Sequence, residues 1–136
     1  MIYILDGDTF TGKTSFLRKH IKDNPQKNSL YLTDEAWIDL LIRCAHKSDT
    51  NEKCADFATE EISCYDIVCI DNADFLAGRG IILGISANVI LNLYEKTDFF
   101  LSGINMKKKM KPMIDIIQSG GASITWLDYR KESCEV

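Results

Sequence analysis

The sequence predicts an α/β protein in which a five-stranded parallel sheet lies between two layers of helices. Two observations support this prediction. Five short apolar runs alternate with segments of helical character along the 136 residues, and strands that alternate with helices are typical of a parallel sheet. In addition, residues 66–70 read DIVCI, which is largely apolar without alternation, as in a strand that is buried on both faces.

Each expected strand is a short run dominated by apolar residues between polar or turn-forming residues. In chain order, the strands are expected at residues 2–5, 29–33, 66–70, 98–102 and 122–127. Numbered in this order, they are expected to lie in the sheet as 5-1-4-3-2, joined by the right-handed crossovers that parallel strands favour.

The expected helices carry apolar residues at helical spacing. In residues 35–45, for example, Trp37, Leu41 and Ala45 recur every four residues and lie on one face. The last helix is expected to have Pro112 in its first turn and to stop at the Gly-Gly pair that follows. The other helices are expected at residues 14–22, 54–62, 84–94 and 110–118, with a polar loop at 47–53.

The composition is that of one soluble globular domain, residues 1–136. Hydrophobic residues make up 46% and charged residues 26% of the chain, which are ordinary values. No apolar stretch is long enough to cross a bilayer, and the N-terminus lacks the basic segment of a signal peptide. The five cysteines form no CxxC pair, so we expect reduced thiols in a cytoplasmic protein without a membrane partner. The net charge of −4 disfavours nucleic acid as a general partner.

The strongest functional signal is the segment GDTFTGKT at residues 7–14, which matches the phosphate-binding pattern GxxxxGK[ST]. It follows the first expected strand and opens the first expected helix, which is the context that the pattern requires. Glycines let the loop turn its N–H groups inward, and the helix N-terminus adds positive potential. The expected nucleotide-binding residues are therefore Gly7, Asp8, Thr9, Phe10, Thr11, Gly12, Lys13, Thr14 and Ser15.

Lys13 and Thr14 have the side chains that act on the nucleotide. A lysine at this position reaches the β- and γ-phosphates, and the hydroxyl after it binds Mg²⁺. Asp71 directly follows the buried run at 66–70 and supplies the second metal ligand of such proteins. ATP and Mg²⁺ are therefore the expected cofactors, with Thr14 and Asp71 as the metal ligands.

Three blocks of the sequence resemble the ATPase core of DnaA-like replication initiators, which belong to the AAA+ family. The blocks are GDTFTGKTSFL at 7–17, SLYLTDEAWIDLLIRC at 29–44 and YDIVCIDNADFLAGRG at 65–80. They follow one another in the family's order, and the resemblance covers residues 2–103. It implies a three-layer α/β/α P-loop NTPase sandwich that binds ATP and Mg²⁺, here without residues for the helical lid and the DNA-binding domain.

Departures from the family pattern bear on catalysis. The family places an acidic residue directly after the metal-binding aspartate, whereas this chain has Asn72, and an amide orients water without accepting its proton. Lys13 and Asn72 are therefore the expected catalytic residues, and hydrolysis is expected to be slow. Asp74 is a second carboxylate nearby, but a role as cap of the next helix is favoured for it. The usual place of an arginine finger holds Lys107, Lys108, Lys109 and Lys111.

Other polar residues at the strand ends allow two interpretations each. Ser102 ends the fourth strand, where such folds keep a sensor of the γ-phosphate, although an ordinary exit from the strand explains it equally well. Asp34 and Glu35 suit a helix N-terminus, and in a kinase they would contact the phosphoryl acceptor. The lysine cluster at 107–111 is more typical of a solvated loop than of a nucleic-acid site, so DNA is expected to bind only weakly or indirectly.

Two functional hypotheses follow from these residues. The first is a compact AAA+-like module that binds ATP and acts as a nucleotide-dependent interaction protein or weak ATPase, in DNA replication or mobile-element biology. A protein partner would then supply the missing functions. The second is a small-molecule kinase that transfers the γ-phosphoryl group of ATP to a hydroxyl. The small size and the acidic pair at 34–35 favour the kinase. The strand expected at 29–33, which lies in the sequence between the phosphate-binding loop and the strand that ends at Asp71, and the lack of an arginine-rich lid disfavour it.

Overall fold

Five parallel strands form the centre of the computed structural model, which describes residues 1–129. The strands are β1 (Ile2–Gly7), β2 (Ser29–Thr33), β3 (Ile67–Asp71), β4 (Asp98–Gly103) and β5 (Ile124–Tyr129). They lie in the order β2-β3-β4-β1-β5, and all neighbouring pairs are parallel. This is the expected order 5-1-4-3-2 read from the other edge, so the fold class and the strand order are confirmed.

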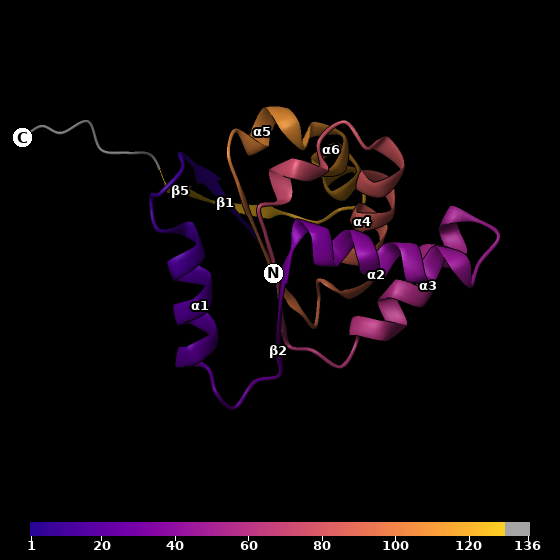
Figure 1. Cartoon of the computed structure of the whole chain (residues 1–136), viewed down its shortest axis with the longest axis horizontal. Helices are drawn as coiled ribbons and strands as arrows, with labels where there is room; N and C mark the ends of the chain where they lie inside the picture. Colours follow the sequence, from indigo (N-terminus) through magenta and orange to yellow (C-terminus); the bar gives the residue numbers. More distant parts are fainter. Residues whose placement is uncertain (130–136) are drawn as a thin grey trace, which may run out of the picture.

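Helices cover both faces of the sheet. They are α1 (Lys13–Asp23), α2 (Asp34–His46), α3 (Asn51–Ile62), α4 (Gly80–Leu93), α5 (Met106–Lys109) and α6 (Lys111–Ser119), with a 3₁₀ helix η1 (Ala73–Leu76). Figure 1 shows α1 on one face of the sheet and α2, α3, α4 and α6 on the other. The architecture is therefore the expected three-layer α/β/α sandwich.

Some element boundaries differ from those expected. Helix α3 begins at Asn51 rather than at residue 54, because the Thr50 side chain caps it by accepting a hydrogen bond from the Lys53 N–H at 3.1 Å. Helix α4 begins at Gly80 rather than at residue 84. The short elements η1 and α5 were not expected, since four residues cannot display a helical period. Pro112 lies in the first turn of α6, as expected.

The core is divided between the two faces of the sheet. The larger apolar cluster lies under α2, α3, α4 and α6, where the Trp37 indole N–H donates a hydrogen bond of 2.8 Å to Ser86 Oγ and joins α2 to α4. The smaller cluster lies under α1 and includes Leu5, Leu17 and Phe100. All residues of β3 are buried, as its continuous apolar run indicates. Within residues 1–129, no helix combines the length and apolar character that a membrane span needs. The sequence from Arg130 on is polar and is expected to form a tail, and these residues lie outside the described part of the chain.

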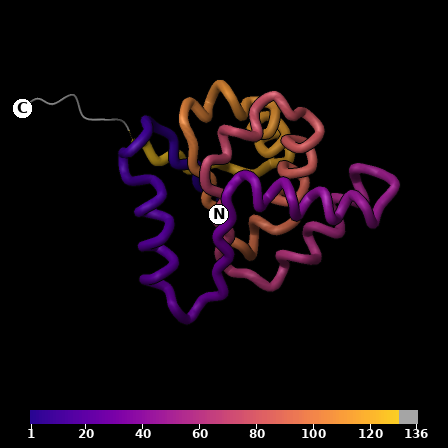
Figure 2. The backbone as a smooth tube through the Cα atoms, in the orientation of Figure 1, coloured from indigo at the N-terminus to yellow at the C-terminus, as the bar shows by residue number. Residues whose placement is uncertain are grey.

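The parallel strands all end at one edge of the sheet. Figure 2 shows the turns that follow β1 and β4 at the same, upper end of the molecule. The 3₁₀ helix η1 follows β3 directly at this edge. Ligands of open α/β folds bind outside the carboxyl ends of the strands, so the fold brings the expected site residues to the appropriate edge.

Candidate nucleotide-binding site

A cavity of about 280 Å³ opens at the carboxyl edge of the sheet, between the turns that follow β1, β3 and β4. It contains the expected loop residues apart from Gly7 and Asp8, together with Asp71 and Asn72. Its lining is Thr9, Phe10, Thr11, Gly12, Lys13, Thr14, Ser15, Asp71, Asn72, Asp74, Phe75, Gly103 and Ile104. The structure therefore brings together residues that are about 60 positions apart in the chain, as the sequence predicts.

The loop between β1 and α1 is built around residues in the left-handed region. Gly12 has φ 94° and precedes α1, a conformation that favours glycine because it has no Cβ. Phe10 also has a positive φ, of 60°, and its ring is 95% exposed. The Thr11 hydroxyl donates a 2.7 Å hydrogen bond to the Asp8 carbonyl. These features fold the loop back over the N-terminus of α1, where backbone N–H groups attract anions.

Lys13 is the first residue of α1, and its side chain reaches back into this loop. Its ammonium donates hydrogen bonds to the Gly7 carbonyl, at 2.8 Å, and to the Asp8 carbonyl. Burial lowers the pKa of Lys13, while the carboxylates of Asp74, Asp8, Asp6 and Asp71 act in the opposite direction. When a nucleotide binds, its phosphate oxygens can take the place of these backbone carbonyls as hydrogen-bond acceptors of the Lys13 ammonium.

Asp71 is the most heavily hydrogen-bonded carboxylate of the site. Its Oδ2 accepts hydrogen bonds from the Thr14 hydroxyl, at 2.7 Å, and from the Tyr31 hydroxyl. Its Oδ1 accepts from the Ser102 hydroxyl and from the Asn72 N–H, at 3.1 Å. Burial alone would raise the pKa of Asp71, but the donated hydrogen bonds outweigh it and hold the pKa below its usual value. The Asp71 carboxylate is therefore ionised at neutral pH, which is the form that binds a metal ion.

The donor set at Thr14 and Asp71 fits Mg²⁺. Magnesium prefers oxygen ligands, keeps several waters and is held in nucleotide sites by one or two carboxylates together with phosphates. The Thr14 hydroxyl and the Asp71 carboxylate oxygen lie 2.7 Å apart, so one ion can contact both. Ser102 is fully buried and does not line the cavity. Its hydrogen bond to Asp71 holds that carboxylate in place, and a role as sensor of the γ-phosphate stays a prediction.

Tyr31 is a site residue that the sequence analysis did not single out. Its hydroxyl donates to Asp71, and this contact together with burial raises the pKa of Tyr31 to about 12. The Arg18 guanidinium lies 4.8 Å from the centre of its ring. The register pairs Tyr31 with Cys69 and Thr33 with Asp71, so Tyr31 lies diagonally across from the carboxylate. The contact between Tyr31 and Asp71 depends on the register of β2 against β3, which cannot be predicted from local sequence patterns.

The acidic pair after β2 forms a helix N-terminus. Asp34 and Glu35 lie in the first turn of α2, which Thr33 caps by accepting a hydrogen bond from the Ala36 N–H at 3.3 Å. Acidic residues at this position suit the helix dipole. Neither carboxylate lines the cavity, so the structure supports a role at the helix N-terminus over contact with a phosphoryl acceptor.

The lysine cluster is largely engaged within the chain. Lys107 Nζ lies 5.1 Å from the centre of the Trp126 ring, and Lys111 forms a 2.8 Å ion pair with Asp115. Lys109 lies 3.7 Å from the Asp74 carboxylate. These contacts favour a solvated surface over a nucleic-acid site, although the cluster lies on α5 and at the start of α6 rather than in a loop.

The favoured role of Asp74 as a helix cap is wrong. The next helix, α4, begins at Gly80 after Arg79, and no side chain caps it. Asp74 instead lies within η1, is 7% exposed and lines the cavity. The short 3₁₀ helix between β3 and α4, which has no sequence signature, turns this side chain toward the site.

We expect Tyr31→Phe to destabilise the protein by about 1 kcal/mol at neutral pH, because it removes a hydrogen bond to a carboxylate but keeps the ring under Arg18. The pKa of Asp71 in the folded protein would then rise. A depressed carboxyl pKa contributes stability above the unfolded-state value and loses it as the pH falls through the folded-state value. The free energies of unfolding of the variant and the wild type, measured in urea, should therefore converge in acid.

Tyr3→Phe is the matched control, because it removes a tyrosine hydroxyl from β1 and keeps the aromatic ring at position 3 stacked on Phe100. An equal loss of stability in both variants, with no dependence on pH, would argue against a specific contribution from the Tyr31–Asp71 hydrogen bond.

The strand order and the loop geometry together define a class of protein. A phosphate-binding loop between β1 and α1, an aspartate at the end of β3 and a strand between β1 and β3 are the features of P-loop NTPase folds with an additional strand. The chain has this fold, and its sheet order is that of an AAA+ core.

Comparison with solved structures identifies proteins that have a similar fold. A replication initiator DnaA bound to AMPPCP and single-stranded DNA matches with a TM-score of 0.74 and 14% identity, over 96% of this chain and 40% of that chain. Domain III of DnaA from Thermotoga maritima matches with a TM-score of 0.68 and 18% identity, over 93% and 54% of the two chains. Drosophila ORC bound to GC-rich DNA and Cdc6 matches with a TM-score of 0.60 and 11% identity, over 96% and 49%.

The fold is therefore that of the DnaA-like AAA+ core, as the sequence blocks imply. The chain spans only 40% to 54% of the length of these similar chains. No protein-family model matches the sequence, and no curated protein matches it either.

Proposed function

We propose that this chain is a single cytoplasmic domain, residues 1–136, that binds ATP and Mg²⁺ and acts as a nucleotide-dependent interaction protein or weak ATPase. The observation that carries the proposal is the convergence of Lys13, Thr14 and Asp71 on one cavity, with the two metal-ligand oxygens 2.7 Å apart. Titration of the protein with ATP and Mg²⁺ tests it. Saturable binding is the expected result, and no binding would contradict the proposal.

We propose a setting in DNA replication or mobile-element biology, and the similar structures support the first of the two. One of them is a DnaA bound to an ATP analogue and single-stranded DNA, and another is an ORC bound to DNA. In this chain, three of the four clustered lysines contact other side chains of the chain. DNA contact by this domain is therefore proposed to be weak or indirect.

A protein partner is proposed from the rim of the cavity. Phe10 is 95% exposed, Phe75 is 64% exposed, and Ile104 is 37% exposed. All three line the nucleotide cavity. Apolar side chains that are gathered beside a ligand site are typical of interaction surfaces. The binding of a nucleotide in the cavity would alter this rim, so a partner that binds there would respond to the nucleotide. The kinase alternative has no comparable observation in its favour.

Replacing Asn72 with aspartate is expected to raise the rate of ATP hydrolysis about tenfold or more, since a positioned acid–base group contributes roughly 10²–10⁴ in rate. The full effect is not expected, because the cluster at 107–111, which occupies the usual place of an arginine finger, contains lysines and no arginine. Asn72 has φ 57°, a conformation that both asparagine and aspartate tolerate, so the substitution keeps the turn. Phosphate release under saturating ATP measures the rate.

Asn72→Ala is the control, because it removes the amide without adding a carboxylate. A wild type that turns over several times per second, with Asn72→Ala equally fast, would show that residue 72 does not limit catalysis.

A further inference from the structure

We propose that Asp74 is the carboxylate that orients the attacking water and takes its proton during ATP hydrolysis, and that Lys109 positions it. This inference rests on the proposed function and assigns the group that carries out its slow hydrolytic step. Asn72, which follows the metal-binding aspartate, can orient water through its amide but cannot act as a base.

The placement of Asp74 is unusual for a structural aspartate. It is 7% exposed, lines the nucleotide cavity and caps neither η1 nor α4. Among the described residues, the one ionic partner of its side chain is Lys109, whose ammonium is 3.7 Å away. A carboxylate that lines a ligand cavity and leaves most of its hydrogen-bonding capacity unused within the chain can act on what the cavity holds.

Asp74 is also close to the group that is expected to hold the γ-phosphate. Lys13 and Asp74 both line the nucleotide cavity, Lys13 from the start of α1 and Asp74 from η1. A water molecule beside Asp74 would lie next to the terminal phosphate held by Lys13.

The end of β4 fixes the position of the Asp74 side chain. A Cβ placed on Gly103 would lie 2.7 Å from Asp74 Oδ1 and 2.9 Å from Asp74 Cβ, so the carboxylate is packed directly against the glycine backbone. Only glycine at position 103 leaves enough room for the Asp74 carboxylate in this place. The segment after β3 and the end of β4 are therefore in close contact at the Asp74 carboxylate.

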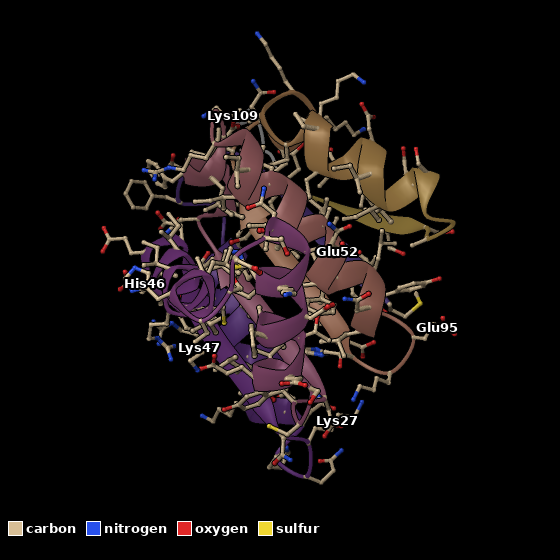
Figure 3. The ribbon with its side chains drawn as sticks, turned by 90° about the vertical axis from the view of Figure 1, so that its right-hand side faces the viewer. Lys27, His46, Lys47, Glu52, Glu95 and Lys109 are labelled. Carbon is tan, nitrogen blue, oxygen red and sulfur yellow. The ribbon has the colours of Figure 1, made fainter. Side chains whose placement is uncertain are left out.

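Lys109 reaches the carboxylate from α5. Figure 3 shows Lys109 at the upper end of the molecule, opposite the end that carries Lys27, and Lys27 lies in the turn before β2. Lys109 is therefore on the carboxyl edge of the sheet, as Asp74 is. Its ammonium balances the charge of Asp74 and limits the orientations that the carboxylate can adopt.

The proposed step is direct attack of water on the γ-phosphorus of ATP. The water oxygen forms a bond to the γ-phosphorus, and the bond between this phosphorus and the β–γ bridging oxygen breaks, leaving its electron pair on ADP. The proton of the water passes to the Asp74 carboxylate, which later releases it to solvent. The products are ADP and inorganic phosphate.

Single-turnover hydrolysis, with protein in excess over ATP and with Mg²⁺, tests the inference. Asp74→Asn is expected to lower the rate constant by about tenfold or more, while ATP binds at least as tightly because a negative charge near the γ-phosphate is removed. The control is Asp115→Asn, which removes a carboxylate from an exposed ion pair with Lys111 and should leave both quantities unchanged.

The positioning role of Lys109 has its own pair of variants. Lys109→Met is expected to lower the rate constant severalfold without changing ATP affinity, and Lys109→Arg to restore most of the rate. Lys111→Met is the control in the same cluster. Lys109 is an exposed residue, so these variants test the inference even if Asp74→Asn does not fold.

Three results would overturn the inference: a wild type that binds ATP but hydrolyses it no faster than buffer, a folded Asp74→Asn protein with the wild-type rate, or equal rates in Lys109→Met and Lys111→Met. A wild type that does not bind ATP would instead overturn the proposed function, so the two failures are distinguishable.

Discussion

Lys13→Ala is expected to weaken ATP binding by at least tenfold, which corresponds to about 1.4 kcal/mol. The ammonium is the cation that the loop directs at the β- and γ-phosphates, and in the structure it already bonds to the Gly7 and Asp8 carbonyls. Removing it takes away a charge-assisted contact with the phosphates and loosens the loop. Calorimetric titration with ATP and Mg²⁺ gives the affinity.

Lys19→Ala is the matched control for this variant. Lys19 lies farther along the same helix in an exposed ion pair with Asp23, so its replacement removes an equal charge away from the cavity. The control should bind ATP as the wild type does. If Lys13→Ala kept the wild-type affinity, the assignment of the loop as the phosphate site would be wrong.

Gly7→Ala is expected to destabilise the folded protein by about 3 kcal/mol or more. A Cβ on Gly7 would lie 1.9 Å from the Tyr129 carbonyl oxygen and 2.2 Å from its carbon. These are backbone atoms of β5, whose carbonyl also accepts a 3.0 Å hydrogen bond from the Asp8 N–H. Relief of the clash requires β5 to move away from β1, and overpacking alone typically costs about 1–3 kcal/mol.

Urea unfolding of Gly7→Ala measures this loss. Gly84→Ala is the contrasting variant, since Gly84 lies inside α4 and a Cβ there meets nothing within 4 Å. That substitution should stabilise the protein by roughly 0.5–1 kcal/mol, because alanine favours the helix. Equal stabilities of the two variants would contradict the close approach of β1 and β5.

Much of the fold could be predicted because its signals are local or follow from general rules. The buried run before Asp71 is continuous, as in a covered parallel strand, and the phosphate-binding pattern falls between β1 and α1 as expected. The strand order follows once the sequence blocks are compared with an AAA+ core. The sequence therefore predicts that Lys13, Thr14 and Asp71 share one site, and all three line the same cavity.

The remaining site residues depend on three-dimensional relations. Tyr31 reaches Asp71 through the register of β2 and β3, which residue types alone do not set. Asp74 enters the cavity because η1 separates it from α4, and a 3₁₀ turn of this length has no periodic pattern. Gly103 matters through the carboxylate packed on it, a contact between segments that are far apart in the chain.

The central claim is that the loop after β1, together with Thr14 and Asp71, binds ATP with Mg²⁺. Titration with ATP and with a slowly hydrolysed analogue, each with Mg²⁺ and with a chelator, tests it most directly. The account predicts saturable binding of both nucleotides that weakens without Mg²⁺, and an Asp71→Asn variant in which Mg²⁺ no longer strengthens binding. Absence of binding by the folded wild type, or an Asp71→Asn variant with an unchanged response to Mg²⁺, would contradict it.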